Sequence, residues 1–188
     1  MSFLAVWQRY YQLLVILLLV FCLSSLGNFP VLAGINDDTY EGNIYILYAG
    51  NGSLVPSRLT LAQTLARETP GVLVFCVDDS SDCKQYSIVV SRLQEYYGKA
   101  ASIIPVAVDS LGMNSNYTTA EPGYYYQGVV PQTVVIDQKG QVVLNAQGQI
   151  PYEQVDDVLR KVFDLLPRSE SVKLKRRSFN EYNTELTN

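Results

Sequence analysis

Two stretches decide the fold of this chain: GVLVFCVDDSSDCK at residues 71–84, and GVVPQTVVID at residues 128–137. In the first, an apolar run ends at a turn of aspartates and serines, and a helical pattern begins at Cys83. A run rich in β-branched residues and bounded by turn signals is typical of a buried central strand. In the second, Pro131 precedes a new apolar run, which suits the first residue or the edge of a strand. X-Pro is also the bond at which a cis peptide costs little.

The two stretches together resemble the thioredoxin fold. Residues 73–84 align with the strand and CxxC turn of that family, and residues 130–133 with its cis-proline loop, which faces the turn. Ser80 takes the position of the family's first, nucleophilic cysteine. Only the second position, Cys83, keeps its sulfur, so the motif that would make the resemblance strong is broken.

The rest of the pattern is consistent with this fold class, α/β with a central mixed sheet flanked by helices. We expect helices to begin near Ser57, Cys83 and Pro151. A hairpin is expected around the turn at residues 137–140, where Gly140 can adopt a positive φ. The strands that the apolar runs predict are residues 44–48, 72–77, 103–109, 133–136 and 141–144.

Composition excludes several classes of site. The 188-residue chain is 48% hydrophobic, enough for one ordinary domain with a core, and it contains no histidine. Histidine is the commonest general base and metal ligand, and no Cys/His cluster has metal spacing, so we expect no metal and no cofactor. Acidic residues outnumber basic ones within residues 36–166. An acidic domain repels phosphates, so nucleic acid is not an expected partner.

The N-terminal segment indicates a membrane. An apolar run begins at Leu13 and follows Arg9 and aromatic residues. It fits a transmembrane anchor over residues 11–29, and equally a secretory signal cleaved after Ala33. We favour the anchor, and the position of Arg9 predicts a single pass with the domain on the lumenal or periplasmic side, in a thylakoid or inner membrane.

Three regions follow from these patterns. Residues 1–35 form the anchor or signal segment, residues 36–166 the thioredoxin-like domain, and residues 167–188 a flexible basic tail. The basic cluster at residues 173–177 would suit anionic lipid or an acidic partner, although a solvated end is the ordinary explanation.

The broken motif argues against disulfide exchange. Dithiol exchange needs an attacking thiolate and a second thiol that resolves the mixed disulfide, and Ser80 lacks the acidity and nucleophilicity of the first. Asp78, Asp79 and Asp82 should raise the pKa of a nearby thiol. Cys76 is interpreted as core filler, because a disulfide with Cys83 would require the helix start to fold back onto the strand.

What remains is a surface for an extended peptide. No residue is expected to be catalytic, and Cys83 is the alternative. An exposed Tyr124-Tyr125-Tyr126 run is a candidate client-binding loop, unless some of these tyrosines close the edge of the domain. The predicted groove is formed by Ser80, Ser81, Asp82, Cys83, Val130 and Pro131.

The whole pattern is similar to a family of cyanobacterial membrane-anchored thioredoxin-like proteins of thylakoids. That resemblance implies a redox-inactive factor that binds protein clients and supports the accumulation of a membrane complex, photosystem I. The alternative is a thiol-disulfide oxidoreductase or thiol relay that works through Cys83 alone. A soluble periplasmic binder released by signal cleavage is a third, weaker possibility.

Overall fold

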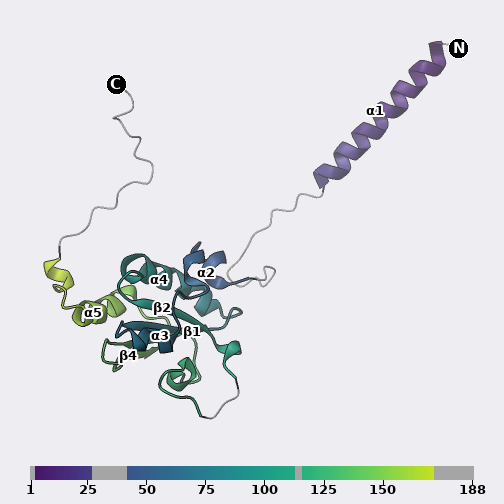
Figure 1. Cartoon of the computed structure of the whole chain (residues 1–188). Coiled ribbons are helices and arrows are strands. Elements are labelled where there is room, and N and C mark those ends of the chain that lie inside the picture. Colours follow the sequence, from purple (N-terminus) through teal and green to yellow (C-terminus); the bar gives the residue numbers. More distant parts are fainter. Residues whose placement is uncertain (1–2, 27–41, 113–115, 172–188) are drawn as a thin grey trace, which may run out of the picture. The chain divides into compact units, whose positions relative to one another are not determined.

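The computed structural model describes residues 3–26, 42–112 and 116–171. The chain divides into two units, one ending at Tyr40 and the other beginning at Glu41. The first unit contains a single long helix, α1 (Phe3–Leu26), whose described side chains are exposed. The second unit contains the sheet (Figure 1). The basic cluster at residues 173–177 and the cleavage position after Ala33 lie outside the described residues.

The predicted transmembrane helix finds no support here. Within the described part of the chain, none of the helices combines the length and the apolar character that crossing a bilayer requires. The last residues of the anchor predicted at 11–29 lie beyond the end of α1.

The second unit is built on a four-stranded mixed sheet with the order β2-β1-β3-β4. The central strand β1 pairs in parallel with β2 and antiparallel with β3, and β3 forms an antiparallel hairpin with β4. Gly140 has φ +76° in the hairpin turn, as expected. The strands are β1 (Gly71–Cys76), β2 (Ser102–Ala107), β3 (Gln132–Ile136) and β4 (Val142–Gln147).

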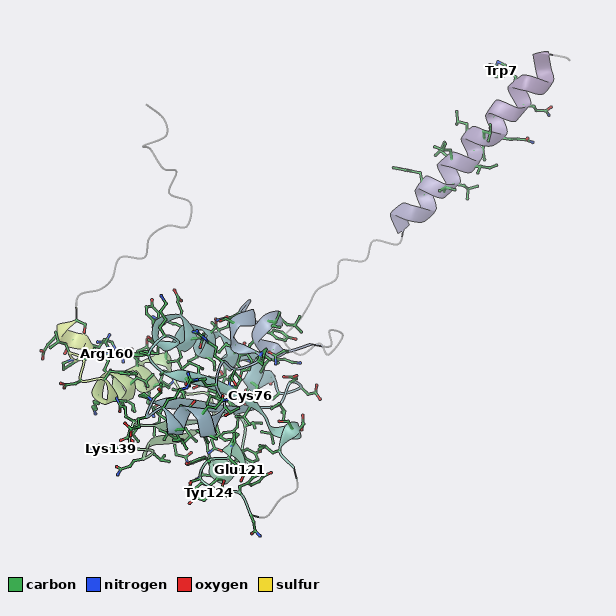
Figure 2. All side chains as sticks on the ribbon, in the orientation of Figure 1. Trp7, Cys76, Glu121, Tyr124, Lys139 and Arg160 are labelled. Atoms are coloured by element: carbon green, nitrogen blue, oxygen red, sulfur yellow. The ribbon has the colours of Figure 1, made fainter. Side chains whose placement is uncertain are left out.

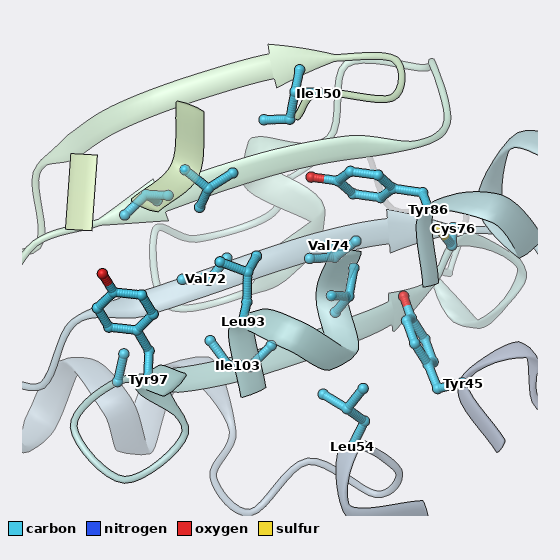
Figure 3. Close-up of a cluster of buried hydrophobic side chains, with 14 of the residues drawn as sticks. Tyr45, Leu54, Val72, Val74, Cys76, Tyr86, Leu93, Tyr97, Ile103 and Ile150 are labelled. Carbon is cyan, nitrogen blue, oxygen red and sulfur yellow. The ribbon is translucent and has the colours of Figure 1, made fainter. Parts of the chain in front are cut away.

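Helices cover both faces of the sheet, which is the expected thioredoxin-like arrangement. Alternate residues of β1 point to opposite faces, so Val72 and Val74 join one core while Leu73 and Phe75 join the other. The first core, part of which is drawn in Figure 3, packs against α2 (Ile44–Leu47), α4 (Ser81–Tyr97) and α5 (Tyr152–Val162). The second packs against α3 (Leu61–Ala66) and the short 3₁₀ helix η3 (Pro122–Tyr125).

One predicted strand is wrong. Residues 44–48 form the helical turn α2, because Asn43 caps it: its side-chain oxygen accepts a hydrogen bond from Tyr45 N at 3.0 Å. A half-buried strand would bury alternate residues, but here the adjacent Ile44 and Tyr45 are buried.

Helix starts were predicted to within a few residues. The helix expected near Ser57 is α3, which begins at Leu61 because Thr60 and Gln63 form a capping box. The helix expected at Cys83 begins at Ser81, and α5 follows Pro151 directly. The 24-residue connection between β2 and β3, residues 108–131, includes the short 3₁₀ helices η2 (Val108–Ser110) and η3.

A buried carboxylate joins α4 to α5 and to the segment that follows. Asp156 accepts hydrogen bonds from Tyr97 Oη at 2.5 Å and from Arg160 Nε at 2.8 Å, and lies 3.3 Å from Arg168 Nε. Burial acts to raise the pKa of the Asp156 carboxyl, but these hydrogen bonds outweigh it and hold the pKa below its usual value. Residues 168–171, which include η4 (Arg168–Glu170), are thereby held against α5 (Arg160 is labelled in Figure 2).

We predict that Asp156→Asn lowers the free energy of unfolding by about 2–4 kcal/mol, because it leaves two arginines without their buried counter-charge. Asp157→Asn is the matched control: that side chain is 56% exposed and its ion pair with Arg168 should be worth about 1 kcal/mol or less. Urea denaturation measures both. Because the folded pKa is lowered, the stabilisation by Asp156 is present above the unfolded-state pKa of about 3.9 and is lost as the pH falls through the folded value. Equal losses in the two variants would contradict this role.

Candidate functional site

Ser80 is the residue immediately before α4, at the position that the sequence aligns with the first cysteine of the thioredoxin turn. Its backbone is extended, and its Oγ accepts a hydrogen bond from Cys83 N at 3.2 Å, so it caps α4. Ser81 and Asp82 occupy the first turn, where a carboxylate suits the positive end of the helix dipole. A hydroxyl therefore fills the position of the exchanging sulfur and serves as a helix cap.

Cys83 is not available at the surface. Its side chain is fully buried and that of Cys76 is 4% exposed, and both are free thiols in one core cluster. The two thiols influence each other's pKa, although no disulfide joins them. The interaction with Cys83, together with burial, raises the pKa of Cys76.

Asp82 acts to raise the pKa of Cys83, as expected of a nearby carboxylate, but the net shift of that pKa is downward. The hydrogen-bonding influence of Cys76 is the largest and lowers the pKa of Cys83. The Val77 backbone and the Ser80 hydroxyl act in the same direction, against burial and the charge of Asp82. Ser80 and the start of α4 thus still favour a thiolate at this position, but the thiolate would form beneath the surface.

A tyrosine that sequence reasoning missed lies beside these thiols. Tyr45 of α2 is 3% exposed and belongs to the same cluster as Cys76 (Figure 3). Its hydroxyl has no hydrogen-bond partner of good geometry among the described residues, and burial raises its pKa. Residues 44–48 had been assigned to a strand, so nothing in the sequence indicated this contact.

The second half of the site is the loop that enters β3. The Val130–Pro131 peptide bond is cis, and Pro131 is buried. Val130 is half-buried and packs against both cores. No hydrogen bond to the backbone N–H or C=O groups of residues 128–130 occurs within the described chain. Gly128 has φ +83°, and nothing lies within 4 Å of the position a Cβ would take there, so the loop faces open space.

Residues 148 and 149 contact both the loop at Pro131 and the turn at Asp82. Gly148 N donates to Pro131 O at 2.7 Å, and the next residue, Gln149, donates through Nε2 to Asp82 Oδ1 at 2.9 Å. Tyr86 of α4 and Thr133 of β3 share a buried hydrogen bond of 2.8 Å beneath this surface. Residues 148 and 149 thus link Asp82 of the turn to Pro131 of the loop, while Cys83 lies below the surface.

The three consecutive tyrosines have different environments. Tyr124 is 55% exposed (Figure 2). Tyr125 is buried, and its hydroxyl donates to Thr119 O at 2.8 Å. The Tyr126 ring packs on Phe75, with 5.4 Å between the centroids. Tyr124 is therefore the exposed ring of the three, while Tyr125 and Tyr126 pack against the domain.

Carboxamides fix the geometry of this loop. The buried Gln132 accepts from Gln127 N at 2.9 Å through Oε1, and donates through Nε2 to Tyr125 O and to Asn145 Oδ1. A single glutamine thus ties the loop, β3 and β4 together. Its role was not visible in the sequence, because a glutamine at the first residue of a strand carries no signal of burial.

The polar side chains around the candidate site are mostly carboxylates. The side chains of Asp78, Asp79 and Asp82 are exposed, and partial desolvation raises the pKa of the Asp78 carboxyl. Among the residues whose placement is described, no group of three or more Cys, Asp or Glu side chains can hold a metal ion. The available elements are an open backbone edge, an apolar loop and a capped helix start.

Comparison with known proteins gives one extensive match. The thylakoid membrane protein slr1796 of Synechocystis is 55% identical over 168 residues, which are 89% of this chain and 83% of the relative. No protein-family model matches the sequence.

Two solved structures show a weaker similarity. Thioredoxin-2, described as a component of the malaria parasite protein secretion machinery, is 20% identical, with a TM-score of 0.39 over 50% of this chain and 82% of that one. The exposed lipoprotein thioredoxin of Streptococcus pneumoniae is 15% identical, with a TM-score of 0.40 over 58% and 98% of the respective chains.

We predict that burial, not thiol acidity, controls the reactivity of Cys83. In a Cys22→Ser background, N-ethylmaleimide should modify Cys83 of the folded chain at least roughly a hundredfold more slowly than in urea, even at about pH 9. Peptide mass spectrometry after timed quenching measures the rates. Labelling of the folded chain at the unfolded rate would mean that the thiol reaches the surface.

Proposed function

Because this chain belongs to the thioredoxin-like family of the thylakoid membrane protein slr1796, we propose that it is a membrane-associated factor that holds an extended segment of a protein client without reacting with it. The observation that carries this proposal is the open backbone edge at residues 128–130, next to a serine where the exchanging sulfur would be.

The mode of binding is strand addition. An extended peptide gains affinity by pairing its main chain with unpaired N–H and C=O groups, and gains specificity from neighbouring side chains. Residues 128–130 offer such groups, while Val129 and Tyr124, which are 43% and 55% exposed, offer apolar contact. The buried Gln132 holds this edge in place.

The membrane part of the proposal concerns α1. The relative is named as a thylakoid membrane protein, and we extend that location to this chain. In this account the apolar run within residues 11–29 attaches the chain in a single pass, and the domain faces the lumen or periplasm. The clients are subunits of a membrane complex whose accumulation the protein supports, with photosystem I as the candidate.

Photo-crosslinking tests the binding edge. A photoreactive phenylalanine analogue at Val129 should give adducts with client proteins in intact membranes, because this side chain borders the open edge. The same analogue at Val143 of β4, a valine of nearly equal exposure at 42%, should give none. Adducts from both positions, or from Val143 alone, would count against a groove at residues 128–130.

A deletion strain tests the role in the cell. Val129→Glu should lower photosystem I content to roughly that of the deletion strain, because a charge at the edge opposes apolar contact, while Val143→Glu should restore it. Both variants must accumulate to wild-type levels on immunoblots. Full restoration by Val129→Glu would contradict the proposed site.

A second candidate function is thiol chemistry through Cys83, which is favoured by its lowered pKa beside Cys76. Its complete burial opposes this function. Cys83→Ala separates the two candidates in the same strain: the binding account predicts that the variant restores photosystem I, and a thiol relay predicts that it does not. A thermal denaturation curve of the purified variant distinguishes loss of chemistry from loss of fold.

A further inference from the structure

A second site lies at the opposite end of the sheet. The candidate groove is at the carboxyl end of β1, whereas a cavity of about 480 Å³ opens where β1 and β2 begin. This volume is within the range of small-molecule sites, about 300–1,000 Å³. The residues that line it are Ser53, Arg58, Leu59, Arg67, Thr69, Gln94, Gly98, Lys99, Ala100, Ala101, Ser102 and Ile103.

The charged residues that line this cavity are all positive, although the chain as a whole has a negative net charge. Three cations, Arg58, Arg67 and Lys99, line it, and no carboxylate does. The whole chain has a net charge of −4. Across the described residues, none of these three cations is within ion-pair distance of a carboxylate. Their charge is therefore not neutralised by the fold.

Helix termini explain only part of this arrangement. Arg67 is the C-cap of α3, and Lys99 follows the C-cap of α4, where a cation offsets the partial negative charge of the last carbonyls. Arg58 belongs to no helix; it comes from the loop before Thr60. Three separate elements thus bring cations to one cavity, and the dipoles account for two of them.

Neutral donors complete the lining. Within the described chain the Ser102 hydroxyl and the Gln94 carboxamide have no side-chain hydrogen bond, and both border the cavity. The Gln94 carboxamide lies against Gly98, where a Cβ would be 2.6 Å from Gln94 Nε2. Any larger residue at position 98 would displace this donor. The cavity thus combines charged and neutral donors, which are the groups that bind tetrahedral oxyanions.

We propose that this cavity binds an organic phosphate or sulfonate through Arg58, Arg67 and Lys99. The volume exceeds that of a bare oxyanion, so the ligand carries further atoms. Two sources share this chemistry: a soluble phosphate ester, and the headgroup of an anionic lipid. The site is independent of the client groove, because it shares no residue with it and lies at the other end of β1.

The first test is binding of pyrophosphate, which supplies the oxyanion without a carrier. Isothermal titration calorimetry of the full chain in nonionic detergent should detect binding that weakens as salt is raised. The Arg58→Gln/Lys99→Gln double variant should weaken it at least tenfold. The matched control is Lys139→Gln/Lys161→Gln, which removes the same charge from exposed positions outside the cavity (Lys139 is labelled in Figure 2).

A lipid arm separates the two sources. Native mass spectrometry of the full chain in mixed micelles compares retention of phosphatidylglycerol with that of phosphatidylcholine. If the wild-type chain retains phosphatidylglycerol selectively, and only the Arg58→Gln/Lys99→Gln variant loses this retention, the ligand is a lipid headgroup. If pyrophosphate binding depends on Arg58 and Lys99 but no lipid is retained selectively, the ligand is a soluble ester. The absence of both, or equal losses in the two double variants, overturns the proposal.

Discussion

The burial of β1 on both faces is the constraint on which the structure depends. Every residue of this strand is buried, and each face contributes to a separate core. Burial of apolar surface stabilises the folded state by roughly 25 cal/mol for each Å² removed from water. A strand buried on both faces is therefore held firmly, and the segments joined to its ends are positioned with it. Its carboxyl end delivers Cys76 and the turn to α4, and its neighbour β3 delivers Pro131 to the same edge. The candidate groove is a consequence of that pairing.

The sequence was most informative where periodicity and turn chemistry agreed. The double-sided burial of β1, the hairpin around Gly140 and the helix after Ser80 were all predicted, because each has a strong local signal. The strand predicted at residues 44–48 failed because a short apolar run fits a strand and a helical turn equally well. The outcome depended on Asn43, whose side chain caps the helical turn.

The places of Ser80 and Val130 in the fold follow from the order of strands and helices, since Ser80 caps α4 and Val130 precedes β3. That these residues form a binding groove stays a prediction. The sequence did not indicate that Cys76 interacts with Cys83 or that Tyr45 packs beside them. These contacts lie between side chains of three elements, so only packing determines them. The cavity with Arg58, Arg67 and Lys99 was invisible for the same reason.

The account's central claim is that Ser80 alone separates this protein from a disulfide oxidoreductase, and disulfide reduction by the Ser80→Cys variant tests it most directly. A thiolate at this position would accept the hydrogen bond that Cys83 N now donates to Ser80 Oγ, at the positive end of α4. With dithiothreitol as reductant and insulin as substrate, the wild-type chain should not exceed the uncatalysed rate, and Ser80→Cys should exceed it at least about tenfold, since an activated thiol is the missing element. Turnover by the wild-type chain, or no gain in a correctly folded Ser80→Cys variant, would contradict the account.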